Sequence, residues 1–211
     1  MISTSDYSLL PSLQQLQQAC KAISVLDAIM SQEWQYRYYS YNSKWSDGEE
    51  CFEMRNGGGD HMLILFRKDG CVINGMAHEY FPKDKSELTK GLPGIYDEFI
   101  SGEPVSSLGT TFCLWTATEA TWTVGEITDH EDGSEYLLAI FDGNPQTYMD
   151  WATEYYEIDF PNQNDSLKVI TDIYKGTTLT KNMVLSLVDK LEDWEKLTQD
   201  LQDIDYPHDF A

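Results

Sequence analysis

The chemistry available to this chain is mainly that of carboxylates, which gather in a segment without basic residues. Between Lys90 and Lys168 the sequence has no Lys or Arg but fifteen Asp and Glu residues. Over its 211 residues the chain carries 36 acidic and 14 basic residues, a formal net charge of -22. Such a surplus attracts cationic partners and repels phosphate polymers and anionic membranes. We therefore expect a basic partner protein, and no binding to nucleic acid or membrane.

One group of these carboxylates lies in a predicted helix from Pro145 to Glu157. The pair Asn144-Pro145 is typical of a helix cap followed by a first helical residue. Helical spacing places Asp150, Glu154 and Glu157 on one face of this helix. Exposed acids of this kind provide steering and specificity in protein recognition.

Aromatic residues of the same helix are expected on its other sides. Tyr148, Trp151 and Tyr155 share a face that we predict to meet the core. Tyr156 falls outside this apolar face, toward the acids, and is predicted to act as an aromatic anchor, since interfaces are enriched in such residues.

A second group of carboxylates lies between Asp129 and Glu135. A calcium loop needs a glycine at its sixth position and a bidentate Glu at its twelfth. Here Gly133 is fifth and the twelfth residue is Ile140, so we favour a solvated turn and predict no metal ligand. The partner-binding residues predicted from both groups are Asp129, Glu131, Asp132, Asp150, Glu154, Tyr156 and Glu157.

No pattern typical of an enzyme accompanies these acids. Cys113 with His78, or Ser134 with His130, would supply a nucleophile and a base, but neither has a supporting local motif. The glycine run 57–59 is followed by no helix pattern and is interpreted as a hairpin turn. We predict no catalytic residue and no cofactor. The alternative is a small hydrolase using carboxylates or a divalent metal in the acidic half.

The cysteines and the apolar runs favour a cytoplasmic protein. The four cysteines are widely spaced and form no C-x-x-C pair, which predicts reduced thiols packed as small hydrophobic residues. No apolar run approaches the roughly 20 residues that a membrane span needs. The start of the chain has no pattern of a secretory signal.

The elements that must position these residues are predicted from hydrophobic periodicity. A helix is expected from Pro11 to about Ser31, followed by a strand from Trp34 to Tyr41. Turn residues then separate three strands of a meander, which are 49–55, 61–67 and 71–75. Short apolar alternations predict a second set of strands, which are 110–115, 121–127 and 136–141.

Helices dominate the predicted C-terminal region. Asp165 is expected to cap one helix, which ends near Gly176, and Thr180 to cap another. Because strand meanders come first and helices follow, we predict an α+β fold in which antiparallel sheet meanders pack with helices. The whole chain, 1–211, is expected to form a single domain, with a possible subdivision into 1–90 and 91–211.

One segment resembles a known family. Residues 92–100, with the sequence LPGIYDEFI, resemble the L-P-x-x-Y-x-x-F helix motif of the SUKH superfamily. Many bacterial members of that superfamily are immunity proteins that neutralise secreted toxins. The resemblance implies a mixed α/β binding protein with an acidic surface that faces a toxin.

Together these observations predict a non-enzymatic acidic protein of the immunity or inhibitor type, with a basic partner that could be a toxin. A second alternative, besides the hydrolase, is a structural or regulatory module whose acidity serves only solubility.

We predict that the chain is not retained on immobilised DNA or RNA at about 150 mM salt, because non-specific binding to phosphates depends on Lys and Arg. An electrophoretic mobility assay over a range of salt concentrations tests this. A shifted band at that salt concentration contradicts the expectation.

Overall fold

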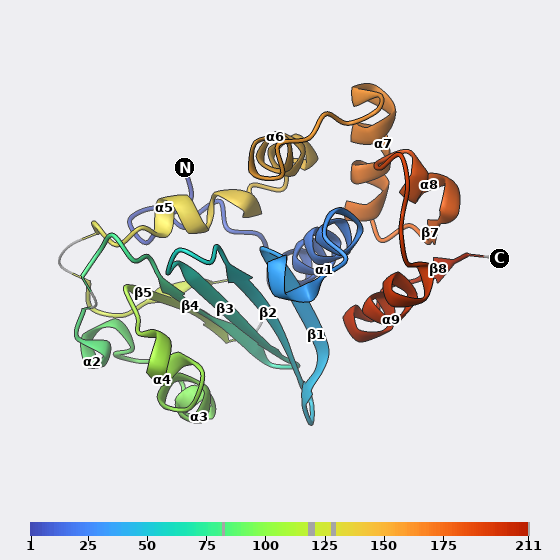
Figure 1. The fold of residues 1–211 in the computed structure, drawn as a ribbon. Coiled ribbons are helices and arrows are strands. Elements are labelled where there is room, and N and C mark those ends of the chain that lie inside the picture. The colour runs from blue at the N-terminus through green and yellow to red at the C-terminus, as the bar shows by residue number, and fades with distance from the viewer. Residues whose placement is uncertain (82, 118–120, 128–129, 211) are drawn as a thin grey trace. The chain divides into compact units, whose positions relative to one another are not determined.

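The computed structural model describes residues 1–81, 83–117, 121–127 and 130–210, which form two compact units (Figure 1). The first, here called the sheet unit, consists of Met1–Leu16 and Lys44–Asp142. The second, the helical unit, consists of Gln17–Ser43 and Gly143–Ala211. Each unit is built from segments that are distant in the sequence.

The main element of the sheet unit is an antiparallel sheet of strands in sequence order. The strands are β1 (Tyr39–Ser46), β2 (Glu49–Arg55), β3 (His61–Arg67), β4 (Gly70–Met76), β5 (Phe112–Ala117) and β6 (Thr123–Val124), and β1 enters this unit at Lys44. The predicted strands 49–55 and 61–67 are confirmed, and the third extends by one residue at each end. In β3 the side chains from Met62 to Phe66 are at most 2% exposed, as expected for a strand covered on both faces.

Short helices cover both faces of this sheet (Figure 1). On one face lie α2 (Lys85–Leu88), α3 (Asp97–Ser101) and α4 (Val105–Leu108), with the short helix η2 (Gly94–Tyr96) before α3. The other face carries α5 (Ser134–Leu137) and η3 (Ala139–Phe141). Side chains from the strands and helices of the first face form one buried cluster, which consists of Leu65, Val72, Leu88, Tyr96, Ile100, Cys113 and Trp115. On the second face Phe52 packs against Phe141, with ring centroids 5.8 Å apart.

The helical unit contains most of α1 (Leu13–Met30), which confirms the first predicted helix. The other helices of this unit are η1 (Trp34–Tyr36), α6 (Pro145–Tyr155), α7 (Gln163–Tyr174), α8 (Lys181–Leu185) and α9 (Trp194–Ile204). Two short parallel strands, β7 (Leu179–Thr180) and β8 (His208–Asp209), join the C-terminal end to this unit. Thr180 caps α8, as predicted, because its side chain accepts a hydrogen bond from the amide of Met183.

Three local predictions are wrong. The segment 136–141, predicted as a strand, is helical, because its apolar residues pack at helical spacing and not in alternation. Residues 34–36 form a turn of 3₁₀ helix, and β1 begins only at Tyr39. Asn162 and not Asp165 caps α7, since the Asn162 side chain accepts hydrogen bonds from the amides of residues 164 and 165.

The antiparallel sheet, its helices and the helical C-terminal region confirm an α+β fold. Across the described ranges, no helix combines the length and the apolar character that spanning a bilayer requires.

A close approach in the sheet gives a test of this packing. Gly75 lies opposite Phe112 in the register of β4 and β5, and a Cβ at this position would overlap the buried Phe112 ring. We expect Gly75→Ala to lower the free energy of unfolding by about 1 to 3 kcal/mol, measured by urea denaturation. Gly58→Ala, in the 57–59 turn, meets only ordinary contacts and is the control. Equal stability of the two variants contradicts this packing.

Candidate protein-binding surface

Helix α6 carries the main group of predicted binding residues. The side chain of Asn144 accepts a hydrogen bond from the amide of Gln146 at 3.1 Å, and Pro145 occupies the first helical position, so the predicted start of the helix is confirmed. Tyr148, Met149 and Ala152 are buried and fix the helix on the core of the helical unit. The opposite side of α6 is therefore turned to solvent.

What we call the α6 acidic face consists of Asp150 and Glu154 of α6 and of Glu157, two residues beyond the end of the helix. All three are exposed, and none forms an ion pair with any residue that the structure describes. Asp150 accepts a hydrogen bond from the uncharged side chain of Gln146 at 2.6 Å. The helix was predicted to run to Glu157, but α6 ends at Tyr155, so helical spacing does not place Glu157 on the face of the other two acids.

The α6 acidic face works against the stability of its own helix. Asp150 and Glu154 are like charges four residues apart, which repel each other on a helix. Glu154 lies in the last turn, where the helix dipole disfavours negative charge, and α6 has no basic residue in that turn to offset it. Glu157 has a left-handed backbone, with φ of 51°, which costs energy for any residue but glycine. Local choices that oppose stability are typical of functional positions.

The exposed aromatic residue beside this face is Tyr155 and not Tyr156. Tyr155 is 40% exposed and stacks on Trp151, with ring centroids 5.0 Å apart and planes at 14°. The ring of Tyr38 meets Trp151 edge-on at 4.9 Å and Tyr155 at 4.8 Å. The expectation that Tyr155 faces the core is therefore wrong, because 40% of the residue is exposed although its ring stacks on Trp151.

Tyr156, predicted to be an exposed anchor, is half-buried. Its ring packs edge-on against Tyr155 at 5.0 Å, and its hydroxyl is fully covered. That hydroxyl lies close enough to Asp27 to lower the pKa of this carboxyl, although it makes no hydrogen bond of normal geometry. Tyr156 thus offers a partner less contact area than Tyr155.

A buried carboxylate that the sequence analysis missed holds α6 in place. Asp27 of α1 is 0% exposed, and it accepts hydrogen bonds from the Tyr148 hydroxyl at 2.8 Å and from the amides of Tyr39 and Tyr38 at 2.8 and 3.1 Å. Burial raises the pKa of Asp27 from 3.8 to about 6, and these hydrogen bonds oppose the rise. One carboxylate therefore ties α1, the start of β1 and α6 together.

The second predicted group, 129–132, is only partly a surface. Asp129 lies outside the described residues, and Glu131 is exposed. Asp132 is 1% exposed, so its predicted role in partner binding is wrong. Its carboxylate accepts hydrogen bonds from the Thr4 hydroxyl at 2.5 Å and from the amide of Ser134 at 2.9 Å. Asp132 is buried because it fastens the N-terminal segment to the start of α5.

The candidate nucleophiles are not arranged as catalytic groups. Ser134 is buried, and its hydroxyl accepts a hydrogen bond from the amide of Thr4 at 3.0 Å. His130 Nδ1 lies 3.2 Å from the Thr4 hydroxyl, so threonine and not serine faces this imidazole. Cys113 is buried in β5, and burial raises the pKa of its thiol to about 12, which disfavours the reactive thiolate.

Within the part of the chain that the structure describes, no three His, Cys, Asp or Glu side chains lie close enough together to hold a metal ion. Comparisons of the chain with protein-family models, with curated proteins and with solved structures found no match.

The raised pKa of Asp27 predicts a pH dependence of stability. Folded Asp27 keeps its proton at pH values where Asp27 of the unfolded chain loses it. Proton binding by the folded state therefore stabilises the fold at low pH, and this contribution is lost as the pH rises through about 6. We expect the free energy of unfolding to fall between pH 5 and pH 8 by about 1 kcal/mol more in the parent chain than in Asp27→Asn.

Urea denaturation at both pH values measures this difference. Asp150→Asn removes one exposed carboxylate from the same unit and is the control, expected to follow the parent. If the Asp27→Asn profile runs parallel to that of the parent, the buried carboxylate does not titrate in this range.

Proposed function

We propose that this protein is a non-enzymatic acidic binding protein, whose α6 acidic face binds a basic partner protein. The observation that supports this most is that Asp150 and Glu154 on α6, and Glu157 just beyond it, are exposed and form no ion pair with any residue in the described ranges, although Asp150 and Glu154 destabilise their own helix. A surface that only had to be soluble gains nothing from acids at the C-terminal end of a helix, where basic residues are favoured.

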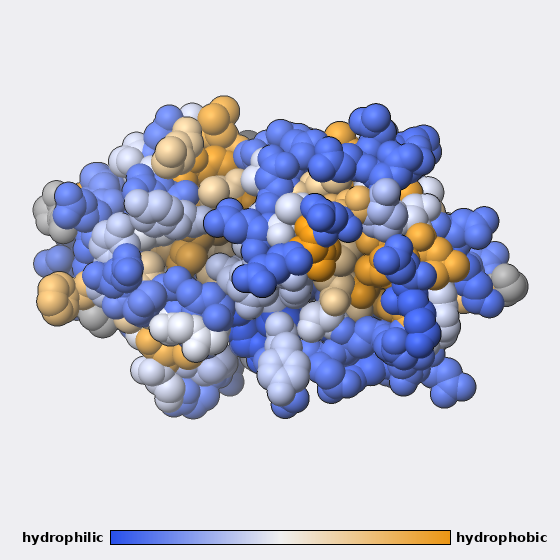
Figure 2. All heavy atoms as spheres, turned by 45° about the horizontal axis from the view of Figure 1, so that its top comes forward, coloured by the Kyte–Doolittle hydropathy of each residue, from blue (hydrophilic) through white to orange (hydrophobic). Residues whose placement is uncertain are grey.

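The aromatic residue beside these acids supports the same proposal. Tyr155 presents 40% of its surface to solvent and is held by stacking on Trp151. Protein interfaces combine such rigid aromatic contacts with surrounding charges, which steer association. Figure 2 draws a face on which hydrophilic residues predominate and hydrophobic ones form separate patches. Such a surface suits binding in which charges speed the initial association and a few aromatic side chains then form the close contacts.

The type of binding protein that we propose is an immunity or inhibitor protein, with a basic toxin as its partner. This rests on the resemblance of residues 92–100 to the SUKH motif. In the structure Tyr96 and Ile100 of this segment belong to the buried cluster of the sheet unit, and Leu92 and Phe99 pack against it. The motif residues are therefore packing residues, and the proposal assigns recognition to a different part of the chain.

Charge reversal tests the proposal. The tagged parent chain and the variant Asp150→Lys/Glu154→Lys are used to retain proteins from the native cell at low and at physiological salt. A basic protein retained by the parent is then purified and its binding kinetics are measured. We expect the variant to associate at least about 10-fold more slowly at low salt, with a weaker dependence on salt.

The matched control is Glu98→Lys/Glu135→Lys, which makes the same change in net charge at exposed positions of the sheet unit. We expect its association rate to stay within about 2-fold of the parent. If both variants slow association equally, only net charge matters and the α6 acidic face is not the site. Retention of no basic protein overturns the proposed function.

A further inference from the structure

The turn that follows α1 exposes two large aromatic side chains. Trp34 is 52% exposed and Tyr36 is 68% exposed, and both belong to the short helix η1. Single exposed aromatic residues are ordinary on a protein surface. Here two of them are carried by three residues of backbone, so the rigidity of that backbone decides whether both can be presented to a partner.

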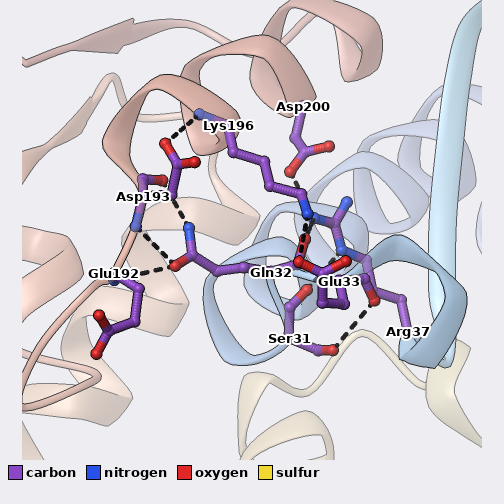
Figure 3. A network of polar contacts seen from close by, with 8 residues as sticks. All are labelled: Ser31, Gln32, Glu33, Arg37, Glu192, Asp193, Lys196 and Asp200. Atoms are coloured by element: carbon purple, nitrogen blue, oxygen red, sulfur yellow. Dashed lines mark hydrogen bonds and ion pairs between the residues drawn. The ribbon is translucent and has the colours of Figure 1, made fainter.

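Arg37 fixes the turn from its C-terminal side (Figure 3). Its guanidinium donates to the carbonyl of Ser31 at 2.6 Å and to the carbonyl of Gln32 at 3.0 Å, both of which precede the turn. It also pairs with the carboxylate of Asp200 on α9 at 2.5 Å. Arg37 is only 5% exposed, so these bonds are shielded from water and hold the two ends of the turn together.

Gln32 and Glu33 fix the turn from its N-terminal side (Figure 3). The Gln32 side chain accepts from the amides of Glu192 and Asp193 at 3.0 and 2.9 Å, and donates to the carbonyl of Asp193 at 2.6 Å. Glu33 pairs with Lys196 at 2.8 Å. Bonds to main-chain groups at the start of α9 leave the turn little freedom.

A fixed turn with exposed aromatic side chains is suited to binding. Ordering a loop on association opposes binding, and a loop that is already ordered in the free protein avoids this cost. Trp and Tyr add large contact areas with few rotatable bonds, which is why they dominate the energetics of many protein-binding surfaces. The bracing of 31–37 therefore prepares Trp34 and Tyr36 for contact with another protein.

The chain just after this turn contacts the end of α6 that carries the acidic face. Tyr38 follows Tyr36 by two residues, and its ring meets that of Tyr155 at 4.8 Å. Tyr155 in turn lies next to Glu154 in α6. The path from the turn to the carboxylates runs entirely within the helical unit, so one partner can reach both.

The charges near the turn limit the chemistry of that partner. The acids around it are Glu33, Glu192, Asp193 and Asp200. The nearby basic groups are already engaged, because Arg37 is buried against Asp200, while Lys196 pairs with Glu33 and Lys190 with Glu192. These three basic side chains, each paired with a carboxylate, offer little attraction to a phosphate polymer or an anionic membrane. These ion pairs leave the turn itself nearly neutral, so the basic character of the partner follows from the α6 acidic face, and the turn adds the apolar contact.

We propose that Trp34 and Tyr36 are the anchor residues through which this chain holds a basic partner protein. This inference rests on the proposed function, but assigns fast association and slow dissociation to different residues. The α6 acidic face sets the rate of association, and the turn 34–36 sets the rate of dissociation.

The test uses the basic protein that the parent chain retains and that has been purified. Its association and dissociation rates are measured with Trp34→Ala, with Tyr36→Ala and with two controls of similar exposure in the sheet unit. The controls are Trp45→Ala, at 42% exposed, and Tyr136→Ala, at 68% exposed. We expect each turn variant to dissociate at least about 10-fold faster with little change in association, and each control to remain within about 2-fold of the parent.

The outcomes separate the two proposals. If the turn variants bind like the parent while Asp150→Lys/Glu154→Lys still slows association, the anchor is overturned and the proposed function stands. Retention of no basic protein overturns both. Sedimentation of the free chain tests whether the turn instead binds a second copy of this chain. If the parent is a dimer and Trp34→Ala is a monomer, the turn is a dimer contact and the inference is overturned. Circular dichroism of each variant confirms that it is folded.

Discussion

The burial of Asp27 is the constraint on which the helical unit depends. An ionised carboxylate in the interior is strongly disfavoured unless hydrogen bonds satisfy it. Asp27 meets this requirement through one hydroxyl, that of Tyr148, and two main-chain amides, those of Tyr38 and Tyr39. Its three donors come from segments more than a hundred residues apart in the sequence. Satisfying this one group therefore fixes where α6 lies on α1 and where the chain leaves η1 for β1, and with them the positions of both proposed binding elements.

Local patterns predicted much of the fold because they carry their own physical signal. Strands β2 and β3 are bounded by glycine-rich turns and match the prediction residue for residue, and α1 follows from its apolar periodicity. The prediction failed where the signal was short. In the segment 136–141 a few apolar residues suited a strand and a helical turn equally well, and contact with the sheet decided between them. The cap of α7 was misplaced because Asn162 and Asp165 are both good capping residues, and only the backbone shows which is used.

The candidate site was partly visible in the sequence. Helical spacing places Asp150 and Glu154 together without knowledge of the fold, whereas Glu157 lies beyond the end of α6, where that spacing no longer applies. The burial of Asp132 and of Asp27 was not visible, since an acidic residue is by default assigned to the surface. For Asp27 the sequence did hold a signal that was not used, since the segment from Ala22 to Ile29 is apolar apart from Ser24 and Asp27, and Asp27 is its one charge. A lone acid within an apolar helix segment predicts a buried, hydrogen-bonded carboxylate, although it does not name the donors.

The distribution of basic residues in the helical unit separates two kinds of surface. Around the turn 31–37 the acids are balanced, because Arg37 and Lys196 pair with Asp200 and Glu33 and make the backbone rigid. Along α6 the acids are not balanced, and their field extends into solvent. Charges paired with an opposite charge stabilise structure at short range. Charges without such a partner act on solvent ions and other proteins over a Debye length of about 8 Å. Arg37 and Lys196 thus hold geometry at the turn, whereas α6 contains no basic residue, as expected if its acids attract a distant cation.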